Sequence, residues 1–273
     1  MKRLTGFIAF VLLLILIFYS AFCNGQVTAA ADPVRYLDPV FTNWTTQNGQ
    51  YQPGYDYTIY KPQGDQEKKV PVIFIYPGGG GDISEVRGWC EDFVRLGYIT
   101  VAAEYKNSVG DFTYSEQIKA VINTWILNQY FRDHSQEFGI KKKKMFEFGI
   151  SAGGITALQS GIALDDKDNP IFGGALPGKN KLVFLGTASL SGAAIPEFQS
   201  LINLGDPPNF FYNGMLDPLI KFSVALQTYE KEISYGIPAN MMAFPDKGHK
   251  LESHDIIYED LKARFYYLLN VKN

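Results

Sequence analysis

The sequence predicts an α/β fold: a single domain with a mostly parallel central sheet and helices on both faces. Continuous apolar runs of strand length alternate with segments whose apolar residues recur at helical spacing, and the connections between them are short. The chain has 273 residues, of which 46% are hydrophobic, and this is enough for one large core. We therefore expect one folded domain over residues 32–273.

Each element is expected where its pattern is clearest. Residues 51–60 alternate between polar and apolar side chains, which favours an early antiparallel strand. Residues 70–76 are apolar throughout, as in a strand buried on both faces. The run of four lysines at 141–144 favours a solvated turn. Among the connections between the expected elements, only 188–208 is long enough to act as a small lid. Further strands are expected at 98–104, 145–150, 181–185, 209–213 and 239–244. Helices are expected at 86–96, 116–131, 220–235 and within 251–271, and one more follows the strand at 145–150 and its turn and runs through residue 164.

Residues 1–31 are typical of a secretory signal peptide. Two basic residues precede an uninterrupted apolar stretch of 13 residues at 7–19, and alanines 29–31 supply a cleavage pattern. A membrane-spanning helix needs about 20 apolar residues, so an uncleaved anchor is the less favoured alternative. Lipidation at Cys23 is disfavoured because the bulky Phe22 precedes it. We expect a secreted or extracytoplasmic protein that meets a membrane only if this segment is retained or lipidated.

Charge and motif content argue against several classes of ligand. The formal net charge is -3 with acidic and basic residues interspersed, which gives no reason to expect a nucleic-acid partner. The glycine run at 78–81 lacks the Lys-Ser/Thr pair of a phosphate-binding loop. No pattern implies a metal or an organic cofactor, and we expect none.

The most informative motif is Phe-Gly-Ile-Ser-Ala-Gly-Gly at 148–154. It places Ser151 between two glycines, after an apolar strand and before a small-residue helix start. Such a strand–turn–helix lifts a serine hydroxyl clear of the sheet, and it is so tight that only glycine fits beside the serine. We expect Ser151 to be a nucleophile.

A serine nucleophile needs a base to accept its proton and a third group to orient that base. Of the three histidines, His249 lies in a turn after the last strand, where a loop can bring an imidazole to the carboxyl edge of the sheet. His134 lies at a polar helix end before the serine. His254, at the start of the final helix, resembles a surface or capping residue. We expect His249 to be the base, with His254 as the alternative.

The orienting acid is expected between the serine and the histidine, at the end of a strand. Asp217 follows the strand at 209–213 by a short Asn-Gly turn. Asp206 is the alternative, but it precedes that strand and so lies at the wrong edge. Asp217 followed by Pro218 also fits a helix N-cap, and the two roles are compatible.

Acyl transfer also needs hydrogen-bond donors for the developing oxyanion. The backbone N–H of Ala152, directly after the nucleophile, is one candidate. Gly79 and Gly80, in the run after Tyr76, are the others. A flexible loop is the plain alternative for this run, but flexibility is costly directly after a buried strand, and close backbone approach explains the glycines better.

Residues 50–270 resemble the α/β-hydrolase superfamily, in particular carboxylesterases and lipases related to hormone-sensitive lipase and small feruloyl or acetyl esterases. Residues 149–154 match the nucleophile motif of these enzymes, 72–80 resemble their strand leading into His-Gly-Gly-Gly, and 101–107 are similar to their tyrosine-bearing strand. The resemblance implies a Ser151, Asp217 and His249 triad in the chain order of the superfamily.

Two departures from that family bear on function. Pro77 stands where the family has histidine, so the support of the glycine loop must differ and the donor assignment can shift by one residue. The chain also lacks a large N-terminal cap, which favours soluble or polysaccharide-borne esters over lipid interfaces. A peptidase or acyltransferase using the same triad, and a non-catalytic binding protein on this scaffold, are the alternatives.

Overall fold

The computed structural model describes residues 32–105, 112–166, 169–173, 182 and 184–271. The chain divides into two units, Met1–Pro33 and Val34–Asn273, and the second holds the fold. The segment expected to be a signal peptide lies outside the described residues, so that expectation stays a prediction. None of the helices in the described part of the chain has the length and hydropathy of a membrane span.

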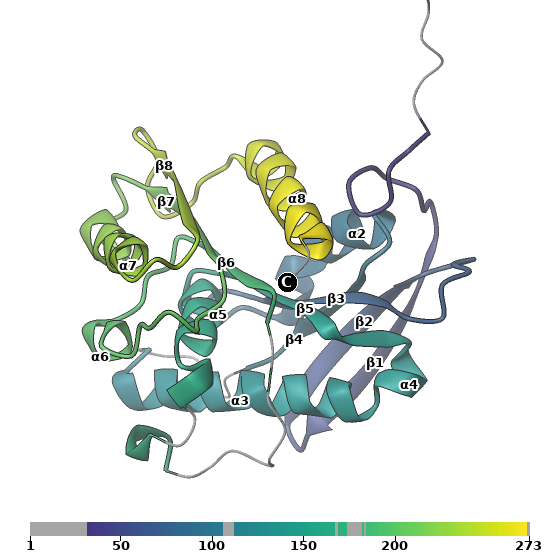
Figure 1. The fold of residues 1–273 in the computed structure, drawn as a ribbon, viewed down its shortest axis with the longest axis horizontal. Helices are drawn as coiled ribbons and strands as arrows, with labels where there is room; N and C mark the ends of the chain where they lie inside the picture. Colours follow the sequence, from purple (N-terminus) through teal and green to yellow (C-terminus); the bar gives the residue numbers. More distant parts are fainter. Residues whose placement is uncertain (1–31, 106–111, 167–168, 174–181, 183, 272–273) are drawn as a thin grey trace, which may run out of the picture. The chain divides into compact units, whose positions relative to one another are not determined.

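Eight strands within the described residues form one sheet in the order β1-β2-β4-β3-β5-β6-β7-β8 (Figure 1). The strands from β4 to β8 pair in parallel, whereas β1 and β2 are antiparallel and lie at one edge. The predicted α/β class is confirmed. The strands are β1 Trp44–Gln52, β2 Tyr55–Pro62, β3 Val70–Tyr76, β4 Ile99–Ala103, β5 Ile140–Ile150, β6 Gly186–Leu190, β7 Asn209–Gly214 and β8 Ala239–Phe244.

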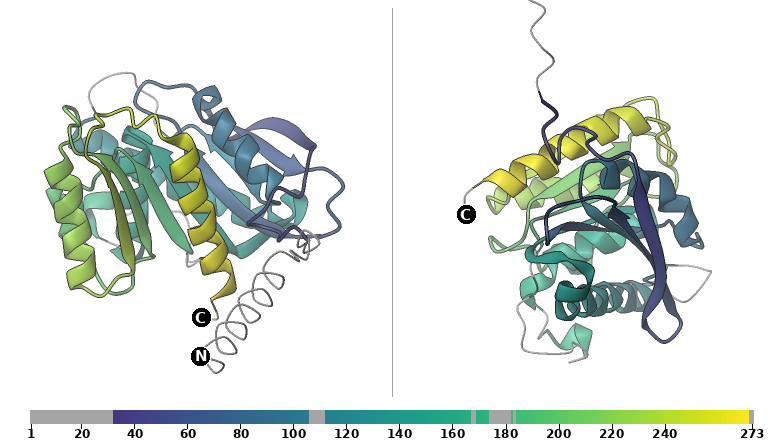
Figure 2. Two further views of the ribbon diagram at one scale, coloured as in Figure 1. Left: turned by 90° about the horizontal axis from the view of Figure 1, so that it is seen from above. Right: turned by 90° about the vertical axis from the view of Figure 1, so that its right-hand side faces the viewer.

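Helices cover both faces of the sheet. Figure 2 shows α8 along one face, where α2 also lies, and the antiparallel strands β1 and β2 at an edge. Helices α3, α5 and α6 contribute to the core on the other face. The helices are η1 Ile83–Val86, α2 Arg87–Arg95, α3 Tyr114–Asp133, α4 Ser135–Phe138, α5 Ala152–Ile162, η2 Leu164–Asp166, η3 Pro170–Phe172, α6 Pro196–Gln199, α7 Phe222–Ser234 and α8 His254–Asn270.

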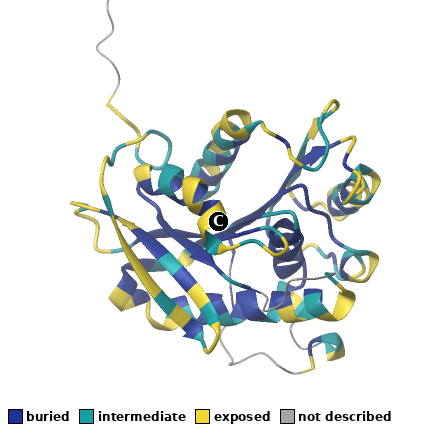
Figure 3. Ribbon diagram, turned by 180° about the vertical axis from the view of Figure 1, so that it is seen from behind, coloured by how far each residue is buried: buried dark blue, intermediate teal, exposed yellow. Residues whose placement is uncertain are grey.

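Burial explains why β3, in the centre of the sheet, is an uninterrupted apolar run. All seven residues of β3 are buried, because successive side chains enter opposite cores. Phe74 belongs to the core on the α3 and α5 side, whereas Ile73 and Ile75 belong to the core under α2 and α8. Figure 3 shows these strands buried and β1 exposed along much of its length.

The antiparallel strand expected at 51–60 is present as β2, and residues 51–52 belong to β1, its partner in a hairpin. Two other local expectations are wrong. Lysines 141–144 lie within β5 and not in a turn. The strand expected at 181–185 lies later, at Gly186–Leu190, although residues 181 and 183 are outside the described part of the chain. The sequence Gly-Thr-Ala-Ser-Leu of β6 is small and partly polar because α5 packs closely against it, so it gives no apolar signal.

The shift of β6 also changes the expected lid at 188–208. Residues 188–190 belong to the strand, and α6 in the middle of the connection packs into the core. Phe198 of α6 is fully buried. The side chain of Gln199 donates to the carbonyl of Ala194 and to the hydroxyl of Thr228. The part of the connection around α6 is therefore packed against the domain.

Candidate active site

The end of β5 and the start of α5 form a strained turn around Ser151. Its backbone has φ 55° and ψ -118°, a region that side-chain-bearing residues rarely adopt. A Cβ on Gly149 would overlap the backbone of Gly153, and one on Gly153 would overlap the carbonyl of Pro77. Glycine is therefore required at both positions, because neighbouring backbone passes too close to leave room for a side chain. The turn presents the serine as the sequence predicts.

A hydrogen-bonded relay joins three side chains from three loops. The Nε2 atom of His249 lies 2.8 Å from Oγ of Ser151, and its Nδ1 atom lies 2.8 Å from Oδ2 of Asp217. An imidazole protonated on Nδ1 donates to the carboxylate and can accept from the hydroxyl. The structure thus brings together the three residues that the sequence singled out.

The carboxylate of Asp217 is buried and has two tasks. While Oδ2 faces the imidazole, Oδ1 accepts the backbone N–H groups of Leu219 and Ile220 at 2.8 and 2.9 Å. These bonds close the turn after β7 and fit the orienting role of Asp217. They also fix the rotation of the carboxylate. The helix N-cap interpretation is wrong, because α7 begins at Phe222 and its N-cap is Lys221.

The loop that bears His249 is held by a residue that the sequence did not reveal. Ser191, directly after β6, has φ 50° and donates its hydroxyl to the carbonyl of His249 at 2.7 Å. Its own N–H donates to the carbonyl of Tyr212. A serine in the left-handed region has no sequence signature, because asparagine or glycine is the usual choice there.

The alternative candidates lie outside this relay. His134 ends α3 and approaches the carbonyl of Tyr130. His254 lines the same cavity, but its Nε2 atom pairs with Asp92 at 3.1 Å and its ring lies against Trp89. Asp206 precedes β7 at the opposite edge, where burial raises its pKa to about 7.

The glycine loop after β3 approaches the nucleophile closely. A Cβ built on Gly78 would lie 3.8 Å from Cβ of Ser151, and Gly78 and Gly79 both line the cavity. Gly80 has φ 76° in a turn closed by the N–H of Gly81 and the carbonyl of Gly78. The loop therefore lies beside Ser151, and Gly78, which was not among the predicted donors, lines the cavity together with Gly79.

Two tyrosines form buried hydrogen bonds at the end of β3, where the glycine loop begins. The hydroxyl of Tyr105 donates to the carbonyl of Pro77 at 3.0 Å. The hydroxyl of Tyr76 donates to Oε1 of Glu147, four residues before the nucleophile, at 2.6 Å. Burial raises the pKa of Glu147 to about 8, so this acid is protonated at neutral pH. These buried hydrogen bonds thus link the glycine loop to Tyr105, and β3 to β5, the strand that precedes Ser151.

The relay opens into a cavity of about 510 Å³ at the carboxyl edge of the sheet. A cavity of this size accommodates a small-molecule ester. Within the described residues, no group of three or more His, Cys, Asp or Glu is arranged to hold a metal ion. Its lining combines the glycine loop, the serine, the histidine and apolar side chains: Gly78, Gly79, Trp89, Ile150, Ser151, Leu190, Ser191, Leu219, His249, Lys250, Leu251, Glu252, Ser253, His254 and Ile257.

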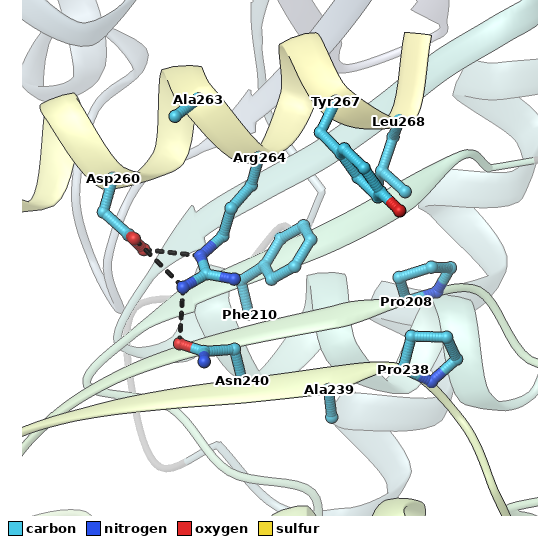
Figure 4. Close-up of a pocket in the computed structure, with 10 residues that line it drawn as sticks. All are labelled: Pro208, Phe210, Pro238, Ala239, Asn240, Asp260, Ala263, Arg264, Tyr267 and Leu268. Atoms are coloured by element: carbon cyan, nitrogen blue, oxygen red, sulfur yellow. Dashed lines mark hydrogen bonds and ion pairs between the residues drawn. The ribbon is translucent and has the colours of Figure 1, made fainter. Parts of the chain in front are cut away.

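A second cavity, of about 440 Å³, lies against α8 at the amino ends of β7 and β8 (Figure 4). Its charged group is already paired: Arg264 donates to Asp260 and to the amide oxygen of Asn240, and its guanidinium lies over the ring of Phe210. Because the guanidinium is satisfied by its neighbours, this cavity has the features of a structural contact between α8 and the sheet.

Comparison with known families agrees with the geometry. Residues 57–182 match the model of BD-FAE, a family of α/β-hydrolase-type feruloyl esterases. No curated protein sequence matches the chain significantly.

Solved structures of Thermogutta terrifontis esterase 2 resemble the chain at low sequence identity. The form phosphoramylated by tabun has a TM-score of 0.68 and 17% identity, covering 82% of this chain and 95% of that one. The form phosphorylated by paraoxon has a TM-score of 0.67, 18% identity and coverage of 82% and 94%. The propionate-bound form has a TM-score of 0.67, 17% identity and coverage of 84% and 97%. At this identity the likeness shows the fold, which is that of the α/β-hydrolases.

Proposed function

We propose that this α/β-hydrolase is an exported serine carboxylesterase that works through an acyl-enzyme on Ser151. The observation that supports it most strongly is the position of His249, hydrogen-bonded at 2.8 Å to both Ser151 and Asp217. One imidazole can then take the serine proton while the carboxylate holds its tautomer. This arrangement favours catalysis over a merely binding role.

In the first step, Oγ of Ser151 attacks the ester carbonyl carbon and its proton passes to Nε2 of His249. Collapse of the tetrahedral intermediate breaks the bond to the alcohol oxygen, which leaves with the proton from Nε2. In the second step, water gives a proton to the same nitrogen and attacks the acyl-enzyme. The carboxylic acid is released, and the proton returns to Ser151.

The oxyanion of each intermediate needs donors beside the nucleophile. The N–H of Ala152, at the start of α5, and the loop at Gly78–Gly80 are the proposed donors. Gly79 is the loop donor that we favour, since it lines the cavity, as Gly78 also does. Each donor of this kind contributes about 3 kcal/mol to transition-state stabilisation.

The substrate class follows from the family match and from the cavity. We propose short-chain or carbohydrate-linked acyl esters, including aromatic acids esterified to polysaccharide, acting outside the cytoplasm after export by the segment at 1–31. Membrane attachment would require that segment to be retained or lipidated.

Hydrolysis of p-nitrophenyl acetate tests the proposal directly. We expect purified protein to turn over this ester, and Ser151→Ala and His249→Ala each to lose more than about 10³-fold in kcat. Ser200→Ala and His134→Ala are the matched controls, because both native side chains are exposed and bond local backbone carbonyls. Full turnover in Ser151→Ala, with the fold intact by circular dichroism, would refute the assignment.

A further inference from the structure

Three exposed apolar side chains lie on residues 215–219, between β7 and α7, and one of them lines the catalytic cavity. We call this segment the lip. Met215, Leu216 and Leu219 are 46%, 65% and 70% exposed. Leu219 also lines the cavity that holds Ser151. Single exposed apolar residues are ordinary on proteins, but three in one short segment beside a cavity point to a contact surface.

The backbone of the lip is fixed, so the exposure of these side chains is not due to a loose loop. Oδ1 of Asp217 accepts the N–H of Leu219 at 2.8 Å. The N–H of Leu216 donates to the carbonyl of Lys247, and that of Met215 donates to the carbonyl of Phe244, both at 2.9 Å. A pre-organised apolar surface loses little conformational entropy when a ligand covers it. The carboxylate that orients the imidazole therefore also positions Leu219.

The remaining lining of the cavity has the same character. Trp89, Leu251 and Ile257 line it and are nearly buried, so they form an apolar wall that has little area left to cover. Leu219 differs, because most of its side chain is still in contact with water. A small acyl group needs only the wall, whereas a larger apolar group must extend towards Leu219.

We propose that Leu219 is a specificity-determining residue whose side chain contacts the larger apolar group of an ester, so that such esters are preferred over acetates. The proposal rests on the esterase function above and specifies its substrate. The neighbouring charges are mixed, since the exposed Asp246 precedes Lys247, whose carbonyl accepts from the lip, and Lys250 lines the cavity. This lacks the broad basic and apolar face of helices that bind lipid surfaces.

Two ester series test the proposal on Leu219→Ser, below the solubility limit of each ester. One varies the acyl group, p-nitrophenyl acetate against hexanoate, and the other varies the alcohol, ethyl against hexyl acetate. We expect the kcat/KM ratio of long to short ester to fall about tenfold in one of the series, because burial of most of a leucine side chain is lost. Leu219→Met should keep the ratio within about twofold, since it restores the apolar contact.

Leu204→Ser is the matched control. Leu204 is 74% exposed but lies before β7, beside Gly236, at the opposite edge of the sheet. We expect its ratios to equal those of the unaltered protein. Unchanged ratios in both series for Leu219→Ser, or an equal fall in Leu204→Ser, would overturn the proposal. Failure of the esterase function itself would appear differently, as absent acetate turnover in the unaltered protein.

Discussion

The two cavities lie at opposite edges of one sheet and are built differently. At the carboxyl edge, Ser151 and Ser191 have positive φ values and an imidazole bridges a hydroxyl and a carboxylate. At the amino edge, Arg264 is satisfied by Asp260 and Asn240. Backbone strain persists only where the surrounding structure holds it in place, and it gathers at functional sites. The difference indicates that the carboxyl edge is organised for chemistry and the amino edge for stability.

Exchanging one carboxylate at each edge should give the largest contrast. In Asp217→Asn, the amide oxygen still accepts from Leu219 and Ile220, which leaves the NH₂ group facing His249. The imidazole must then accept at Nδ1 and carry its proton on Nε2, where it can no longer accept from Ser151. We expect kcat to fall about 10⁴-fold.

Asp260→Asn is the control at the amino edge, where the native carboxylate pairs with Arg264 and accepts from Tyr212. We expect its kcat to stay within about twofold of the unaltered value, while its melting temperature falls. Comparable loss of kcat in the two variants would remove the distinction between the edges.

Glu147 provides a second test, which concerns how the free energy of unfolding depends on pH. Its pKa is about 8 in the folded protein against 4.5 when unperturbed. Between these values the folded state keeps a proton that the unfolded state releases, so the contribution of Glu147 to stability falls as pH rises from 4.5 to 8. Glu147→Gln should lack this decline, and its unfolding free energy relative to the unaltered protein should rise by roughly 3 kcal/mol between pH 5 and pH 8.

Urea unfolding of both proteins at the two pH values measures that difference. Glutamine keeps an acceptor for the hydroxyl of Tyr76, so the variant is expected to fold. Other buried carboxyls, such as Asp206, titrate equally in both proteins and cancel in the comparison. A difference that does not change with pH would contradict the raised pKa.

Loss of the Ser191 hydroxyl tests how the histidine loop is held. Without its bond to the carbonyl of His249, the imidazole should sample more positions, and we expect kcat to fall about tenfold with little change in KM. Ser191→Gly separates this bond from backbone strain. It should lose activity as Ser191→Ala does but be more stable, since glycine tolerates φ 50°.

Ser200→Ala is the matched control, because the Ser200 hydroxyl also donates to a backbone carbonyl, that of Glu197. Its kcat should not change. If Ser191→Ala kept full kcat, or if its loss appeared wholly in KM, Ser191 would not position the base.

The smallest effect is expected at the amino-edge cavity. In Arg264→Met the aliphatic stem is retained, but the pairs with Asp260 and Asn240 and the contact over Phe210 are lost. We expect a loss of about 1 kcal/mol in unfolding free energy and no change in kcat. Reduced turnover at unchanged stability would instead give this cavity a part in function.

Much of the fold was predictable because its central strands are buried on both faces. Residues 70–76 give an uninterrupted apolar run for that reason, and 210–212 give a short aromatic one. Strand β6 gave no such signal, since its small residues accommodate α5: a Cβ on Gly161 would overlap Thr187. The exposed β1 also lacks an apolar run and was missed. A strand of small, tightly packed residues and a solvent-exposed strand both lack the hydrophobic pattern by which strands are recognised.

The site was predictable where the chemistry restricts both residue type and chain order. A serine between glycines, followed by an acid at a strand end and a histidine in a late loop, admits few alternatives, and Ser151, Asp217 and His249 lie together. Ser191 and Leu219 were not predictable, because their roles depend on a φ angle and on exposure. Neither the φ angle of a residue nor the exposure of its side chain can be inferred from the residue type alone.

The central claim is that His249 activates Ser151 for covalent catalysis. Reaction of the folded protein with a fluorophosphonate, followed by intact-mass and peptide mass spectrometry, tests it most directly. We expect one adduct per chain on the peptide that contains Ser151, and no adduct in His249→Ala under the same conditions. An unlabelled protein, or an adduct at another residue with Ser151 unmodified, would contradict the account.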